Sequence, residues 1–159
     1  MKRIGILSDT HSVYDPRMAI HFKDCDEIWH AGDIGDRKVL DKLREIAPTV
    51  RAVAGNIDQP MLAPKELVFE VEGVRVYMTH IAPRGYFKPA GGPVDVVVTG
   101  HSHLLKVYYD RQRQVLNINP GAAGTYGWQP VRTLLRMVID GKEMRDMEVI
   151  ELAPGKPRQ

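Results

Sequence analysis

Aspartate, histidine and asparagine side chains that can bind a divalent metal follow five short apolar runs of this sequence. Ligands gather at the carboxyl ends of strands in α/β sheets, so side chains placed after such runs can meet at one edge of a sheet. Carboxylate oxygens and imidazole nitrogens suit manganese, iron, nickel, cobalt or zinc better than a metal that seeks thiolates. The pattern predicts a metal centre built from Asp9, His11, Asp33, Asn56, His80, His101 and His103.

Seven donors exceed what one ion normally takes from a protein, because open positions must remain for water and substrate. Two ions that share a bridging carboxylate would use the whole set. Each motif alone has a simpler explanation: Asp33 suits a turn, Asn56 suits a left-handed turn position, and His80 could be hydrogen-bonded to backbone. Their ordered occurrence, each after an apolar run, favours the metal site. His21 and His30 lie inside a helix and a strand, and we expect both to be structural.

The elements that must position these donors alternate in the first third of the chain: a strand over 3–7, a helix after Asp15-Pro16, a strand over 27–30, a helix after Asp36 that stops at Pro48, and a strand over 49–54. This order predicts parallel strands. Hairpins over 67–79, 105–118 and 133–151 and a strand over 95–99 follow. The sequence predicts an α/β sandwich with mixed sheets.

The 159 residues favour a single domain over 1–152, followed by a disordered tail over 153–159 that contains two prolines and a glycine. Hydrophobic residues make up 43% and charged residues 26%, which is typical of a globular protein. A net charge of +2 argues against a nucleic-acid partner. The single cysteine, Cys25, indicates a reducing compartment. No run approaches the roughly 20 apolar residues of a membrane span, and the N-terminus is too polar for a signal peptide, so we expect a cytoplasmic protein without a membrane partner.

The donor motifs belong to five ordered blocks that extend over about residues 2–152 and include a late Asn119-Pro120-Gly121 turn. In these blocks the chain resembles the calcineurin-like metallophosphoesterases, and most closely their small, minimal phosphodiesterase members. The resemblance implies a four-layer αββα sandwich in which two mixed sheets are flanked by helices. The blocks are Asp9-x-His11, Gly32-Asp33-x-x-Asp36, Gly55-Asn56-x-Asp58, His80 and Gly100-His101-x-His103.

The resemblance also implies a ligand set and a reaction. One metal is held by Asp9, His11, Asp33 and His103, and Asp33 bridges to a second metal held by Asn56, His80 and His101. Two divalent ions are implied, with manganese expected and nickel, iron, cobalt or zinc as alternatives. A hydroxide that bridges the ions would attack a small phosphodiester or phosphomonoester. The catalytic roles fall on Asp33, Asn56 and Asp58.

Two departures from the family pattern bear on this reaction. Ile57 stands where many members have the histidine that protonates the leaving oxygen, so the chain should prefer good leaving groups. Asp58 loses its usual partner, which makes a turn role as strong as a catalytic one. The segment from Pro83 to Pro93 replaces a helix pattern with prolines and glycines. Its side chains could contact a phosphate or a base, or could form a solvated surface loop; they are Arg84, Tyr86, Phe87 and Lys88.

Other functions remain open for this pattern. A non-catalytic interaction scaffold on the same fold, similar to the retromer subunit that has lost active-site residues, would not need all seven ligands, and all seven are present. A nuclease would usually carry additional DNA-binding segments and a basic stripe. The exposed edges of the predicted hairpins indicate that copies of the chain could associate as a homo-oligomer.

Overall fold

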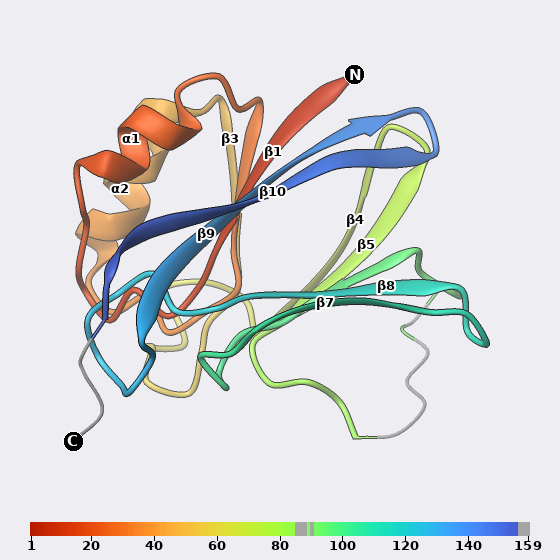
Figure 1. The fold of residues 1–159 in the computed structure, drawn as a ribbon. Helices are drawn as coiled ribbons and strands as arrows, with labels where there is room; N and C mark the ends of the chain where they lie inside the picture. Colours follow the sequence, from red (N-terminus) through yellow and green to blue (C-terminus); the bar gives the residue numbers. More distant parts are fainter. Residues whose placement is uncertain (85–88, 90, 156–159) are drawn as a thin grey trace.

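The computed structural model describes residues 1–84, 89 and 91–155 (Figure 1). The alternating elements of the first third are confirmed: β1 (Lys2–Leu7), α1 (Arg17–Phe22), β2 (Glu27–His30), α2 (Arg37–Ile46) and β3 (Thr49–Ala52). Strand β2 pairs in parallel with both β1 and β3. The carboxyl ends of these strands therefore lie at one edge of the sheet, as the donor pattern requires.

The two helices begin in different ways. Asp36 caps α2, because its carboxylate accepts the backbone N–H of Lys38 at 2.9 Å. The expected cap of α1 is displaced by one residue, since Pro16 occupies the N-cap position, while the carboxylate of Asp15 accepts the backbone N–H of Arg17. Neither helix of the described residues is long and apolar enough to cross a membrane.

The late hairpin completes the first sheet. Strands β9 (Val131–Asp140) and β10 (Glu143–Pro154) pair antiparallel, and β9 pairs antiparallel with β1, which gives the order β10-β9-β1-β2-β3. Strand β10 extends to Pro154, so the first two residues of the expected tail belong to the sheet. Residues 156–159 lie outside the described residues.

The second sheet contains β4 (Glu66–Val71), β5 (Val74–Thr79), β6 (Val96–Val98), β7 (Leu105–Asp110) and β8 (Val115–Pro120) in the order β4-β5-β6-β8-β7. Strand β6 is parallel to β5 and β8, whereas β4 and β7 are antiparallel edge strands. Both sheets are mixed, as predicted. The carboxyl ends of β5 and β6 meet at one edge of this sheet, like those of β1, β2 and β3 in the first.

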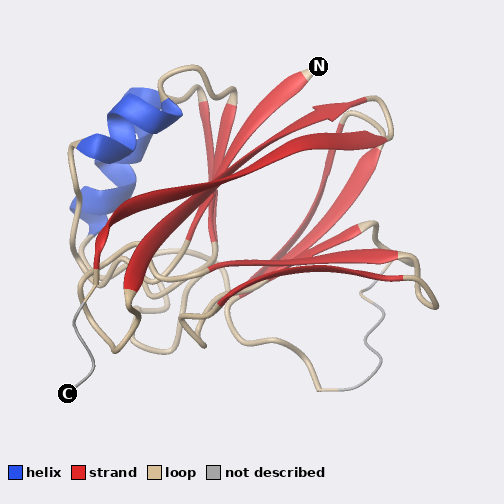
Figure 2. Cartoon of the chain, viewed as in Figure 1, coloured by secondary structure: helices blue, strands red, loops and turns tan. Residues whose placement is uncertain are grey.

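Two apolar clusters hold the layers together. The cluster between the sheets includes Ile6, Trp29 and Met78, and the cluster under the helices includes Phe22 and Leu43; all five are fully buried. The predicted α/β sandwich of two mixed sheets is therefore confirmed. Figure 2 shows that both helices of the described residues cover the first sheet. The described part of the segment after β5 forms no helix over the second sheet, because prolines and glycines in it disfavour one.

Candidate metal centre

The loops that follow four strands converge where the two sheets meet. Asp9 follows β1, Asp33 follows β2, His80 follows β5, and His101 follows β6. The backbone N–H of Asp9 donates to the carbonyl of Gly32, which ties the first two loops of one sheet. The backbone N–H of His101 donates to Oδ2 of Asp9 at 3.1 Å, which ties the second sheet to the first.

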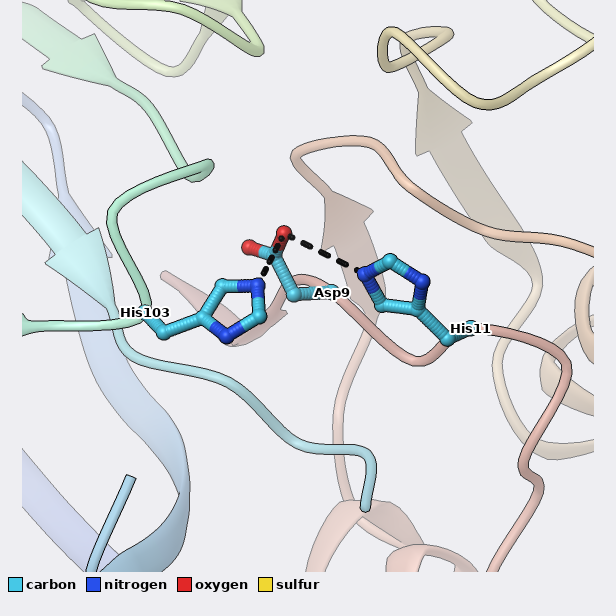
Figure 3. A group of neighbouring side chains, drawn as sticks. All are labelled: Asp9, His11 and His103. Carbon is cyan, nitrogen blue, oxygen red and sulfur yellow. Dashed lines mark ion pairs between the residues drawn. The ribbon is translucent and has the colours of Figure 1, made fainter. Parts of the chain in front are cut away.

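The first group of donors consists of Asp9, His11 and His103, whose ligand atoms all lie within 4.8 Å of one another (Figure 3). Oδ1 of Asp9 is 3.2 Å from Nε2 of His103 and 4.0 Å from Nε2 of His11. Figure 3 shows the two imidazole rings reaching the carboxylate from opposite sides. Asp9 is fully buried and the two histidines are partly buried. These three side chains can hold one ion.

The second group consists of Asp33, His80 and His101, with ligand atoms again within 4.8 Å. Oδ2 of Asp33 is 3.3 Å from Nε2 of His80 and 3.4 Å from Nε2 of His11, which belongs to the first group. The carboxylate of Asp33 thus lies between the two groups, in the position that a bridging ligand requires. Six of the seven predicted ligands are therefore brought together in this centre.

Three buried atoms at this centre have no hydrogen-bond partner in the described part of the chain: Oδ1 of Asp9, Nε2 of His11 and Nε2 of His80. Buried polar atoms are almost always satisfied, because an unsatisfied one costs free energy. All three point into the donor groups, and each is a type of atom that binds manganese, nickel or zinc. The residues present therefore fit a metal centre.

Two of the histidine rings are held in place from behind. Nδ1 of His80 donates to the carbonyl of Ala31 at 2.7 Å, and Nδ1 of His103 lies 3.1 Å from Oε1 of Gln129. Partners of this kind fix the ring so that Nε2 faces the metal. The sequence pattern did not identify Gln129, because it lies 26 residues from His103 and belongs to no motif.

The charges of Asp33 and His80 depend on each other. Burial alone would raise the pKa of Asp33, but the neighbouring imidazole of His80, 3.3 Å away, and the backbone N–H of Ile57 outweigh it and lower the pKa. Burial alone would lower the pKa of His80, but Asp33 and the carbonyl of Ala31 raise it. Each group therefore shifts the other toward its charged form, and because a metal at Nε2 of His80 needs that nitrogen without a proton, metal and proton compete there.

Five of the ligands have left-handed backbone conformations, with φ of 55° at Asp9, 43° at His11, 53° at Asp33, 71° at His101 and 61° at His103. Such conformations are uncommon for residues other than glycine and concentrate at functional sites. The glycines of the motifs allow the loops to approach closely. A Cβ atom on Gly55 would collide with the carboxylate of Asp33, and one on Gly100 would collide with the hydroxyl of Ser8.

The loop over 55–58 places its residues differently. Asn56 is exposed, and its neighbour Ile57 donates its backbone N–H to Oδ1 of Asp33 at 3.2 Å, so Asn56 lies beside the centre. The carboxylate of Asp58 accepts the backbone N–H groups of Ile34, Gly35 and Gly55 at 3.0, 2.8 and 2.8 Å. Asp58 therefore ties two ligand-bearing loops together.

Other residues surround the centre. The ring of Tyr126 stacks on His11 with centroids 4.5 Å apart, and 63% of Tyr126 is exposed. The predicted structural residue His30 is buried and hydrogen-bonded to Thr10, outside both donor groups. Arg84 is exposed, whereas the predicted contact residues Tyr86, Phe87 and Lys88 lie outside the described residues.

A cavity of about 500 Å³ opens beside His101. Its walls come from the loop after β5 and from the outer face of the second sheet, and they combine apolar and polar side chains, among them Ile81, Val97, Tyr108, Val115 and Asn117. Sites for small ligands commonly have volumes of about 300–1,000 Å³. The cavity is therefore large enough for the organic part of a small substrate.

A comparison of the whole sequence with known protein families gives the same family as the ordered motif blocks. Residues 1–142 match the calcineurin-like phosphoesterase superfamily domain. The chain belongs to this superfamily. Membership supports a hydrolase that acts on phosphoester bonds with the help of metal ions, and it confirms the resemblance seen in the motifs.

The relatives of this superfamily member carry related names. A probable metallophosphoesterase of Methanocaldococcus jannaschii, MJ0623, is 32% identical over 155 residues, which cover 87% of this chain and 77% of that protein. Phosphodiesterase YfcE of Escherichia coli is 33% identical over 97 residues, which cover 54% of this chain and 50% of YfcE. The zinc complex of Vps29 from Entamoeba histolytica is 17% identical, covers 94% of this chain and 99% of its own, and has a TM-score of 0.72. The last comparison supports the fold alone.

Proposed function

We propose that this superfamily member is a dinuclear metal-dependent phosphodiesterase. The observation that carries the proposal is the position of the Asp33 carboxylate, which lies 3.3 Å from His80 of one donor group and 3.4 Å from His11 of the other. A single carboxylate between two three-residue groups is what a pair of ions sharing one ligand needs. Nε2 of each of these histidines has no hydrogen-bond partner in the described residues.

The side chains of the centre would divide the work as the motifs imply. One ion would be held by Asp9, His11 and His103. The other would be held by Asn56, His80 and His101, and Asp33 would bind both ions. Bound divalent ions, with manganese expected and nickel, iron, cobalt or zinc as alternatives, would supply a hydroxide nucleophile and neutralise phosphoryl charge. Asn56 is exposed beside Asp33, where its amide can contact a phosphoryl oxygen. Asp58 would act by holding the loops that carry Asp33 and Asn56.

The surroundings of the centre favour small phosphodiesters over large substrates. One ester group can occupy the cavity beside His101 of one donor group, and the exposed ring of Tyr126 lies against His11 of the other. A diester has an organic group on each side of phosphorus and can use both surfaces, whereas a monoester can use one. The net charge of +2 gives little attraction for a long nucleic acid.

A scaffold role is the second candidate, because the Vps29 structures share the fold over nearly the whole chain. A scaffold would not need buried imidazole nitrogens turned toward carboxylates, so the donor geometry favours the enzyme. The two functions differ in one measurable property, which is turnover that depends on added metal.

The test begins with metal analysis of the purified full chain, followed by hydrolysis of an activated diester and an activated monoester with manganese, nickel and zinc. We expect bound metal and faster turnover of the diester. Asp33→Asn should remain folded and lose about a hundredfold or more in kcat/KM, since one substitution weakens both sites. The matched control is Asp41→Asn on the exposed face of α2, which should keep full activity. A metal-free, inactive wild type would favour the scaffold instead.

The cysteine is consistent with the proposed cytoplasmic location. Cys25 is buried, and burial raises the pKa of its thiol to about 11. Such a thiol is neutral near pH 7 and reacts slowly. Cys25 therefore contributes to the core under the helices and has no part in the proposed chemistry.

A further inference from the structure

Strand β7 forms one edge of the second sheet and is exposed along almost its whole length. Between 38% and 54% of each large apolar side chain of this strand is exposed, and these residues are Leu105, Val107, Tyr108 and Tyr109. In the described part of the chain, no strand pairs with its outer edge. A long apolar edge with open backbone groups is a template for another strand, and proteins usually protect such edges.

The pairing of β8 shows which backbone groups of β7 face outward. In β8, the carbonyl of Ile118 accepts the N–H of Thr99, and the N–H of Leu116 donates to the carbonyl of Asp95. Ile118 and Leu116 therefore direct their backbone groups toward β6. Their partners in β7 are Val107 and Tyr109. In an antiparallel ladder such pairs share no hydrogen bonds, so Val107 and Tyr109 present their N–H and C=O groups at the free edge.

We propose that two copies of this chain associate through antiparallel pairing of their β7 edges. The two five-stranded second sheets would then form one continuous sheet across a two-fold axis. The axis passes beside Tyr108, which faces the partner's Tyr108. Val107 lies opposite the partner's Tyr109, so the open backbone groups of both strands are satisfied.

Charge complementarity selects this register. Side chains alternate along a strand, so Lys106 and Asp110 share a face. In the proposed register Lys106 lies opposite the partner's Asp110, and the two-fold axis creates this pair twice. An axis beside Val107 would also satisfy the backbone, but it would place Lys106 opposite the partner's Tyr108 and would leave Asp110 without a cation. Opposite charges across neighbouring strands stabilise pairing, and like charges oppose it.

The test measures the solution mass of the full chain by sedimentation equilibrium over a wide concentration range. The wild type should approach twice the mass of the 159-residue chain. Lys106→Asp would place carboxylates opposite each other at two symmetric positions, so the dimer dissociation constant should rise roughly tenfold. Asp110→Lys should have a similar effect. The combined variant Lys106→Asp/Asp110→Lys reverses both charges and should restore the dimer.

A third variant tests the backbone pairing directly. Val107→Pro removes an N–H that points away from β8, so the hairpin should remain folded while the dimer is lost. Thermal unfolding of each variant confirms folding, which matters for Asp110 because its Oδ1 accepts the N–H of Arg113 in the hairpin loop. Lys42→Asp makes the same charge change on α2 and should leave the dimer intact. A monomeric wild type, or a combined variant that fails to recover, would overturn the proposal.

Discussion

The buried amide of Gln129 holds the ring of His103, with Oε1 of Gln129 3.1 Å from Nδ1 of His103. The amide nitrogen of Gln129 donates to the carbonyls of Gly124 and Tyr126, which fixes the orientation of its oxygen. Nδ1 of His103 therefore carries the proton, and Nε2 is free for a metal. A residue outside the sequence motifs thus sets the direction of a predicted ligand.

Replacing this glutamine should weaken metal binding. In Gln129→Leu the ring of His103 loses its acceptor, and partners of this kind typically contribute about 10–100-fold to metal affinity. We expect a loss of that size at one of the two sites, measured by calorimetric titration of the metal-free protein with manganese. Gln112→Leu, at an exposed position of the hairpin loop, is the control. If Gln129→Leu lowered the thermal stability of the metal-free protein and left the metal affinity unchanged, Gln129 would have a structural role only.

Asp58 should contribute to stability more than to chemistry. Its carboxylate accepts three backbone N–H groups from two loops, and hydrogen bonds to a charged group contribute about 1.5–3 kcal/mol. Asp58→Ala should therefore lower the free energy of unfolding of the metal-free protein by about 2 kcal/mol or more. Denaturant unfolding in EDTA measures this change, with the exposed Asp24→Asn as control. A variant that keeps full stability and loses turnover would instead support the catalytic role.

His30 should make the metal-free protein sensitive to acid. Burial is the main cause that lowers the pKa of His30 to about 3, and its Nδ1 accepts the N–H of Gly32, which requires the neutral ring. The unfolded chain binds a proton below about pH 6.5, and the folded chain does not until about pH 3. The contribution of neutral His30 to the free energy of unfolding is therefore fully present above pH 6.5. It falls as the pH drops toward 3, by up to about 1.4 kcal/mol per pH unit.

The comparison with His30→Gln isolates this effect. The free energies of unfolding of the wild type and of His30→Gln, both measured in EDTA, should converge as the pH falls from 6.5 to 3. The variant has no imidazole to protonate at this position, so only the wild type loses this contribution. Curves that run parallel over this range would show that His30 is not the group responsible.

The ligands could be predicted because their signal is local. Asp9, Asp33, His80 and His101 each follow an apolar run, and parallel pairing brings the carboxyl ends of β1 and β2 to one edge of the first sheet and those of β5 and β6 to one edge of the second. The two mixed sheets were predicted from the order of elements, with strands and helices alternating in the first third of the chain and hairpins following. These features need no knowledge of contacts between distant residues.

The remaining features depend on contacts that no spacing rule describes. The stacking of Tyr126 on His11 joins residues from opposite parts of the chain, and the hydrogen bonds of Asp58 join two loops that are separate in sequence. The sequence therefore left the role of Asp58 open. The family resemblance implied a helix on the second sheet, but the described part of the segment after β5 forms none.

Ile57 should limit the range of leaving groups. Its side chain is 49% exposed, and its backbone N–H donates to Asp33, so a side chain at this position lies at the rim of the proposed centre. Isoleucine cannot donate a proton, and a positioned general acid contributes roughly 10²–10⁴-fold when the leaving oxygen is basic. Ile57→His should therefore raise kcat/KM for an alkyl phosphodiester by about tenfold or more and change little for a p-nitrophenyl diester.

The ratio of these two rates is the measurement, because it cancels changes in metal content. Ile57→Gln serves as the control, since its amide is polar and of similar size but does not transfer a proton. The pH profile of Ile57→His on the alkyl diester should gain a falling limb at a pH above the imidazole pKa, near the ordinary value of about 6.5 unless the site shifts it. If Ile57→His raised both rates equally, or if Ile57→Gln gave the same ratio, the predicted link between Ile57 and leaving-group preference would be wrong.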